Sequence, residues 1–108
     1  MAVNEDLVLY IKDQLSAFGN FETKKMFGGV GYFREGLMFG LLGKDVFHLK
    51  ADDHNRADYE AKGKKAFMST EKKKGMPYYE VPAEVLEDKD QLKVWAGKAY
   101  EAAVRAKK

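Results

Sequence analysis

The chain has 108 residues, of which 45% are hydrophobic and 13% aromatic, enough to form one buried core and too many for a disordered chain. It contains no cysteine, which excludes disulfides, thiol nucleophiles and cysteine-ligated metals. Its net charge of +2 is too small to indicate a nucleic-acid or membrane partner by itself. No apolar run approaches the ~20 residues of a membrane-spanning helix, and the N-terminus lacks the pattern of a secretory signal. We expect a single cytoplasmic domain over residues 1–108.

The first segment predicts an amphipathic helix. Leu7, Ile11, Leu15 and Phe18 follow one another at steps of four, four and three residues, which places them on one helical face. Gly19 then provides a stop signal, so we expect one helix that ends near Phe18.

Alternating and apolar segments between Phe21 and Lys50 predict an antiparallel meander of four strands, at residues 23–27, 30–34, 37–42 and 45–50. The pairs Glu35-Gly36 and Gly43-Lys44 suit two-residue hairpin loops, because glycine readily adopts the positive φ of primed turns.

Two-residue loops would also fix the register of these strands. Phe33 would lie opposite Met38, and Gly31 opposite Gly40, which in turn would face Phe47. Both faces of the middle strand are then apolar, and the Phe47 ring would cover the glycine pair.

The second half of the chain predicts a short helix over residues 52–62, two edge strands at 66–70 and 78–81, and a turn through Leu86. A final helix follows, with Asp88 as its N-cap and Gln91 three residues later. Together these elements predict an α+β fold: a two-layer sandwich in which the N-terminal and C-terminal helices pack on an antiparallel sheet.

No group of residues predicts catalysis or cofactor binding. The glycines at 28–31 open onto a strand rather than a helix, so they indicate a bend and not a phosphate loop. His48, His54 and the neighbouring Asp52 and Asp53 do not converge as metal ligands would, and neither serine lies in a nucleophile motif. We therefore predict a non-enzymatic protein without a metal or cofactor.

A basic segment runs from residue 62 to residue 74 and holds six lysines against one glutamate. Basic residues interleaved with aromatic residues can bind single-stranded nucleic acid. The alternative, which we favour, is a lysine-rich hairpin tip that keeps an edge strand soluble. The candidate nucleic-acid contacts are Lys62, Lys64, Lys65, Lys72, Lys73 and Lys74.

The second apolar sheet face is a candidate surface for a protein partner or for a second copy of the chain in a homodimer. Contiguous exposed apolar area often marks an interface. The alternative is that the C-terminal helix covers this face. The residues predicted for the surface are Phe33, Met38, Phe47, Leu49 and Tyr79.

Several motifs in order along the chain resemble the N-terminal domain of the TfoX/Sxy family. The first is the run KMFGGVGYF at residues 25–33, and the second is GLMFGL at residues 36–41. LKAD at residues 49–52, followed by Asn55 and Arg56, is similar to the family as well. So are YYEVP at residues 78–82 and single residues elsewhere: Phe67, Met76 and Trp95.

This resemblance implies a two-layer α+β domain with an antiparallel sheet and a non-enzymatic role. Larger family members regulate transcription for natural competence, the uptake of DNA, and act with the cyclic-AMP receptor protein. The resemblance carries no catalytic residue or cofactor. These regulators have a second, helical C-terminal domain, so we expect a stand-alone N-terminal-type domain here. Within it, Arg56 is expected to anchor a carboxylate such as that of Asp52.

Overall fold

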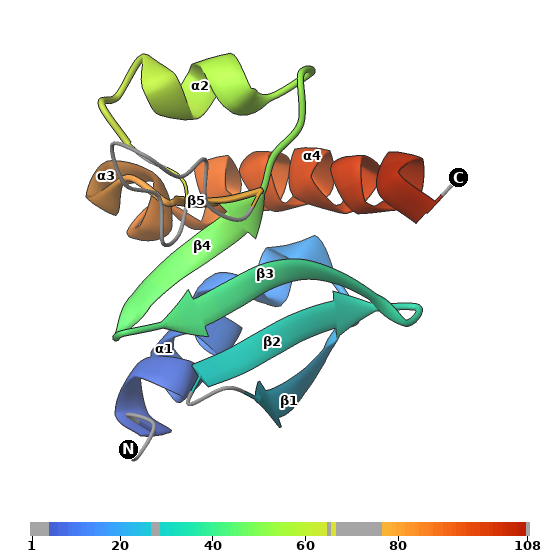
Figure 1. The fold of residues 1–108 in the computed structure, drawn as a ribbon. Coiled ribbons are helices and arrows are strands. Elements are labelled where there is room, and N and C mark those ends of the chain that lie inside the picture. Colours follow the sequence, from blue (N-terminus) through green and yellow to red (C-terminus); the bar gives the residue numbers. More distant parts are fainter. Residues whose placement is uncertain (1–4, 27–28, 65, 67–76, 108) are drawn as a thin grey trace.

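In the computed structural model, which describes residues 5–26, 29–64, 66 and 77–107, five antiparallel strands form one sheet in the order β1-β2-β3-β4-β5 (Figure 1). The predicted meander is therefore confirmed, and each strand pairs with the next strand along the chain. The strands are β1 (Glu22–Met26), β2 (Gly29–Arg34), β3 (Leu37–Gly43), β4 (Val46–Lys50) and β5 (Tyr78–Glu80).

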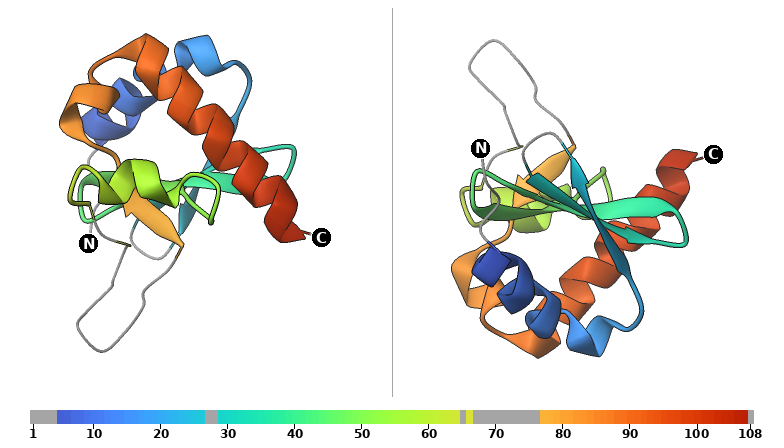
Figure 2. Two further views of the ribbon diagram at one scale, coloured as in Figure 1. Left: turned by 90° about the horizontal axis from the view of Figure 1, so that it is seen from above. Right: turned by 90° about the horizontal axis from the view of Figure 1, so that it is seen from below.

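The helices form a second layer on one side of the sheet, as the α+β sandwich predicts. Figure 2 shows α1, α3 and α4 on the same side, whereas α2 lies beside β5. The helices are α1 (Glu5–Gln14), the 3-10 turn η1 (Ser16–Phe18), α2 (Arg56–Glu60), α3 (Ala83–Leu86) and α4 (Lys89–Lys107). In the described part of the chain, no helix is long and apolar enough to cross a bilayer.

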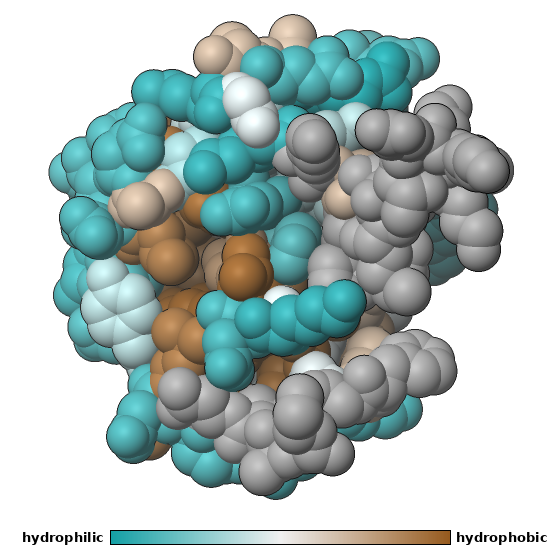
Figure 3. Space-filling model, turned by 60° about the vertical axis from the view of Figure 1, so that its left-hand side comes forward, coloured by the Kyte–Doolittle hydropathy of each residue, from teal (hydrophilic) through white to brown (hydrophobic). Residues whose placement is uncertain are grey.

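The core lies between this helical layer and the sheet. Ile11 and Leu92 are fully buried there, together with the small residues Ala96 and Ala99, which let α4 approach β3 and β4 closely. At the N-terminus of α4 the predicted cap is confirmed, because the Asp88 carboxylate accepts backbone N–H groups of residues 90 and 91 at 3.0 and 3.2 Å. Figure 3 shows hydrophilic residues around most of one side of the molecule and apolar surface gathered towards its centre.

The first helix ends earlier than the sequence predicts. After Gln14 the chain turns through the 3-10 turn η1, and Gly19 has a φ of +109°. Arg34 holds the chain where η1 ends: its Nη2 donates to the Phe18 carbonyl at 2.6 Å, and its Nε donates to the Asn20 carbonyl at 2.9 Å. Its guanidinium also lies 3.8 Å from the centre of the Phe18 ring. Long-range bonds from β2 thus fix the path of the chain after η1, which helical periodicity alone does not show.

The first hairpin confirms its predicted turn. Arg34 pairs with Leu37, so the loop is Glu35-Gly36, with φ angles of 51° and 80°. Both values are positive, as a type I′ turn requires.

The second hairpin turns one residue later than predicted. Gly43 pairs with Val46, so the loop is Lys44-Asp45, with φ angles of 53° and 62°. The prediction of a Gly43-Lys44 loop is therefore wrong.

A β-bulge separates β3 into two registers. Phe33 pairs with Met38 as predicted, but Tyr32 pairs with Gly40, which leaves Phe39 as an extra residue on β3. Gly31 consequently pairs with Leu41, so the predicted pairing of the two glycines is wrong.

The bulge moves two predicted surface residues into the core, whereas the later turn changes only their partners on β3. Phe47 pairs with Leu42 and Leu49 pairs with Gly40, on the face that the helices cover. Phe47 and Leu49 are 2% and 0% exposed, so their assignment to a docking surface is wrong. The Phe47 ring does cover Gly40, because a Cβ added to that glycine would lie 3.0 Å from the ring.

The segment after β4 differs from its prediction in three places. The helix expected over residues 52–62 covers only Arg56–Glu60, because Asn55 organises a turn before this helix. The Asn55 Oδ1 accepts the Asp52 N–H at 2.7 Å, and the Asn55 Nδ2 donates to the Lys50 carbonyl. Of the strand expected at 66–70, Ala66 forms a single bridge to Tyr79, and residues 67–70 lie outside the described residues. The turn expected through residue 86 is the helix α3.

Candidate functional site

The candidate site is the face of the sheet opposite α4, which we call the outer face. Residues that pair across strands share a face, and one row crosses the whole sheet here: Lys24, Gly31, Leu41, His48 and Glu80. None of the described helices covers the outer face of β1, β2 and β3 (Figure 2). The sequence predicts an apolar sheet face outside the helical layer, and the outer face is such a face. That a partner or a second copy docks on it stays a prediction.

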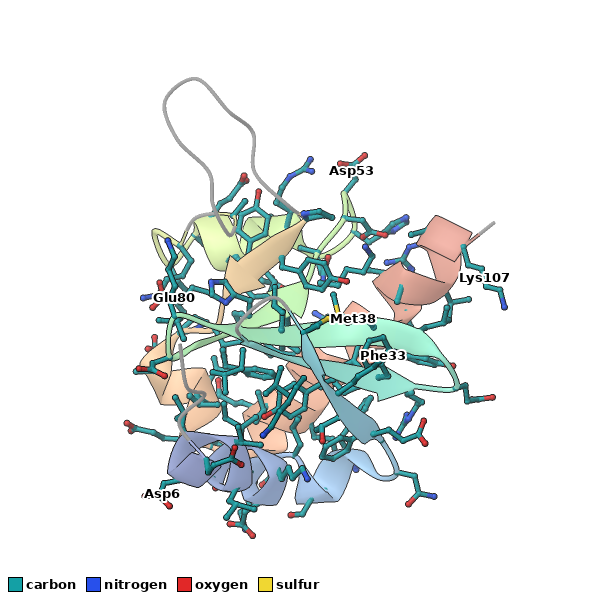
Figure 4. The ribbon with its side chains drawn as sticks, turned by 60° about the horizontal axis from the view of Figure 1, so that its bottom comes forward. Asp6, Phe33, Met38, Asp53, Glu80 and Lys107 are labelled. Carbon is teal, nitrogen blue, oxygen red and sulfur yellow. The ribbon has the colours of Figure 1, made fainter. Side chains whose placement is uncertain are left out.

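Three apolar side chains gather over Gly31 on the outer face. A Cβ added to Gly31 would lie 2.7 Å from the Phe33 ring, 2.9 Å from the Met38 sulfur and 3.1 Å from the Met26 sulfur. Each of these three side chains is half-buried. We call Met26, Phe33 and Met38 the outer-face cluster, and Figure 4 shows two of its members, Phe33 and Met38, side by side on the sheet.

Polar groups beside the cluster are tied to the sheet. The Tyr78 hydroxyl donates to the Met38 carbonyl at 3.2 Å, and the Lys50 ammonium lies 5.0 Å from the centre of the Tyr78 ring. Burial raises the pKa of Tyr78 to about 12 and lowers the pKa of Lys50. The tyrosine therefore keeps its proton at neutral pH and supports the backbone under Met38.

His48 occupies the middle of the outer face but is only 6% exposed. Burial lowers its pKa, against the opposing effects of backbone hydrogen bonds at Leu41 and Val46 and of the charge on Glu80. The imidazole is therefore largely neutral at pH 7. His54 lies on an exposed turn, and the described residues contain no group of three or more side chains that could hold a metal ion.

Tyr79 does not join the outer-face cluster. It pairs with Leu49, which belongs to the core face, and its ring lies 5.6 Å from that of Tyr59. The Tyr59 ring in turn meets Trp95 edge-on at 4.8 Å. Tyr79 therefore packs between the sheet and α2, and the sequence placed it wrongly beside Phe33 and Met38.

Two of the predicted nucleic-acid contacts are engaged by carboxylates. The Lys62 ammonium lies 2.9 Å from Glu84, and the Lys64 ammonium lies 3.6 Å from Glu80. These two carboxylates offset part of the positive charge of the basic segment. Lys65, Lys72, Lys73 and Lys74 lie outside the described residues, so binding of nucleic acid by this segment stays a prediction.

A cleft of about 550 Å³ lies beside β1. Three of its polar side chains are already engaged: Arg34 holds the Phe18 and Asn20 carbonyls, and the Tyr100 hydroxyl donates to Glu35 at 3.2 Å. The cleft is lined by Asn20, Phe21, Glu22, Phe33, Arg34, Glu35 and Tyr100.

The carboxylate of Asp52 has a different partner from the one predicted. Arg105 donates to it from Nε at 2.6 Å and from Nη2 at 3.0 Å, a bidentate pair that ties α4 to the end of β4. Arg56 instead contacts Asp53 at 2.5 Å and Glu60 at 3.8 Å, one turn or less away along the chain. The prediction of an Arg56–Asp52 pair is wrong, because periodicity gives no sign that the last turn of α4 reaches residue 52.

This pair predicts a pH dependence of stability. The hydrogen bonds from Arg105 are the main cause that lowers the pKa of Asp52. The stabilisation is therefore present above the ordinary carboxyl pKa of about 3.9 and is lost as the pH falls through the lowered value. We expect Asp52→Asn to be less stable than the wild type by a constant amount from pH 7 to about pH 4, and the difference to narrow below that. Urea unfolding of both proteins over this pH range measures the difference, and a gap that widens in acid would contradict the assignment.

A family model described as the TfoX N-terminal domain matches residues 13–103. The matched range runs from the end of α1 through the whole sheet and most of α4. No curated protein matches the chain.

Proposed function

Because the chain belongs to the TfoX N-terminal domain family, we propose that it is a non-enzymatic regulatory module of natural competence that acts in the cytoplasm by binding a protein partner. The resemblance of its motifs to competence regulators supports this role. Family membership alone does not indicate which surface binds the partner. We assign that surface to the outer face of the sheet.

The observation that carries the proposal is the outer-face cluster. Met26, Phe33 and Met38 form a contiguous apolar group that is half-buried on a sheet face without a described helical cover. Contiguous apolar surface of this kind marks interaction sites. Two of the three side chains are methionines, whose flexible thioethers adapt to differently shaped apolar side chains. The cluster therefore suits a protein partner that inserts an apolar side chain.

The proposal predicts that a charge in the cluster abolishes function without unfolding the protein. In the source organism, deletion of the gene is expected to lower the frequency of transformation by added DNA, and the wild-type gene to restore it. Met38→Lys is expected to fail to restore it, because an ammonium among the three apolar side chains would lose its water when the partner binds.

The matched control is Val94→Lys at a position that is 54% exposed on α4, which packs on the opposite face of the sheet. It is expected to restore transformation fully, and circular dichroism is expected to show both variants folded. Unchanged transformation after deletion of the gene would refute the competence role. Full rescue by Met38→Lys would refute the outer-face cluster as the docking surface.

A further inference from the structure

The strand β1 stands at one end of the sheet and exposes an edge. In the described part of the chain it pairs with β2 alone, so the other side of Glu22–Met26 presents unpaired N–H and C=O groups. Such an edge is a template for another strand. The side chains along it decide which strand fits.

The outward-facing charges of β1 alternate in sign. Glu22 and Lys24 lie on the outer face, because they pair with Phe33 and Gly31, whereas Thr23 lies on the core face opposite Tyr32. Neither Glu22 nor Lys24 forms an ion pair with another residue that the structure describes, unlike Lys25, which lies 3.2 Å from Glu5. The outer side of the edge thus carries one unengaged anion and one unengaged cation, two residues apart.

When β1 of one copy pairs antiparallel with β1 of a second copy, directly opposite residues lie on the same face of the joined sheet. Outer-face residues must therefore stand opposite outer-face residues. The two-fold axis between the copies then passes through one residue position and not between two positions. With the centre at Thr23, Glu22 of each copy faces Lys24 of the other, which gives two pairs of opposite charge. With the centre at Lys24, two lysines face each other, which is destabilising. The charges therefore select the register centred on Thr23.

We propose that two copies of this chain associate edge to edge through β1, antiparallel and centred on Thr23, to form one continuous sheet. The two-fold axis is then perpendicular to the sheet, so both outer faces point to the same side. A dimer would present two outer-face clusters together to a symmetric partner. The proposal goes beyond the proposed function and depends on Glu22, Thr23 and Lys24 of β1, whereas Met38 lies on β3, so Met38→Lys is expected to leave the dimer intact.

Single introduced cysteines test the register, since the chain has none of its own. Directly opposite residues have Cα atoms about 4.5–5.5 Å apart, within the range of a disulfide. Thr23→Cys is therefore expected to give a covalent dimer with oxidised glutathione. Lys24→Cys is expected to stay monomeric on a non-reducing gel. Crosslinking of Lys24→Cys in place of Thr23→Cys, or of neither variant, would overturn the proposal.

Charge reversal tests the same pairing without a crosslink, by sedimentation equilibrium. Either Glu22→Lys or Lys24→Glu is expected to raise the dimer dissociation constant by at least about tenfold, because two attractive pairs become repulsive. The double variant restores opposite charges and is expected to return within about threefold of the wild type. Lys93→Glu, on the exposed side of α4, makes the same charge change and is expected to have no effect. A wild-type chain that stays at 12.3 kDa up to millimolar concentration would refute the dimer.

Discussion

Replacing Phe47 with alanine is expected to lower the free energy of unfolding by about 3–5 kcal/mol, a large part of the roughly 5–15 kcal/mol that stabilises a domain. Phe47 is 2% exposed, and its ring meets that of Tyr32 at a centroid distance of 5.1 Å and covers Gly40. Truncation would leave a cavity between the sheet and the helices, which surrounding side chains fill only in part. Urea unfolding monitored by circular dichroism gives the value.

Phe33→Ala is the matched control, because it removes the same ring from the outer face. Since the Phe33 ring is half-buried, its loss is expected to cost clearly less, about 1–2 kcal/mol. If the two variants lost similar amounts of stability, Phe33 and Phe47 would share a face, as simple alternation assigns, and the β-bulge would be absent.

Gly29→Ala is expected to have the second large effect, because the added methyl group has no room. A Cβ at Gly29 would collide with the backbone carbonyl oxygen of Leu42, on the neighbouring strand β3. A backbone group cannot turn aside as a side chain can, so β2 and β3 must separate locally and weaken their hydrogen bonds. We expect a loss of about 2–4 kcal/mol in the free energy of unfolding.

Gly97→Ala provides the control for this substitution. Gly97 lies within α4, and nothing comes within 4 Å of an added Cβ there. Because alanine favours the helical conformation, this variant is expected to gain about 0.5–1 kcal/mol. A neutral Gly29→Ala in the same unfolding assay would show that β2 and β3 pair differently from the structure described above.

Local signals in the sequence predicted most of the secondary structure. Glu35-Gly36 combines a glycine with flanking strands and gave the correct turn, and Asp88 with Gln91 gave the correct start of α4. These features depend on neighbouring residues only. The path of the chain after η1 was not predictable in this way, because Arg34, which bonds the Phe18 carbonyl, comes from a strand that follows later in the chain.

The register of β3 shows where local signals fail. The run of apolar residues from Leu37 to Leu42 has no polar position that marks a bulge, so simple alternation predicts the wrong face for the residues that follow Phe39. The second loop changed the predicted partners of β4 but not its face, since Lys44 and Asp45 adopt positive φ angles without a glycine. Packing of Phe39 and Leu42 against the helices decides this register, and it involves residues far apart in the sequence.

The candidate site was therefore predicted in part. Phe33 and Met38 precede the bulge and kept their predicted face, whereas Phe47 and Leu49 follow it and lie in the core. Met26 was missed, although its alternation with Lys24 along β1 is a signal that it shares the outer face.

The exposure of the outer face is tested most directly by the reactivity of single introduced thiols. Under native conditions, the thiol introduced by Met38→Cys is expected to react with a disulfide reagent within about tenfold of its rate in urea, since the half-buried position is reached by solvent without unfolding. The thiol introduced by Phe47→Cys is expected to react at least about a thousandfold more slowly, because it becomes accessible only on unfolding. Equal protection of both thiols would mean that the outer-face cluster is covered within the chain and is not available to a partner.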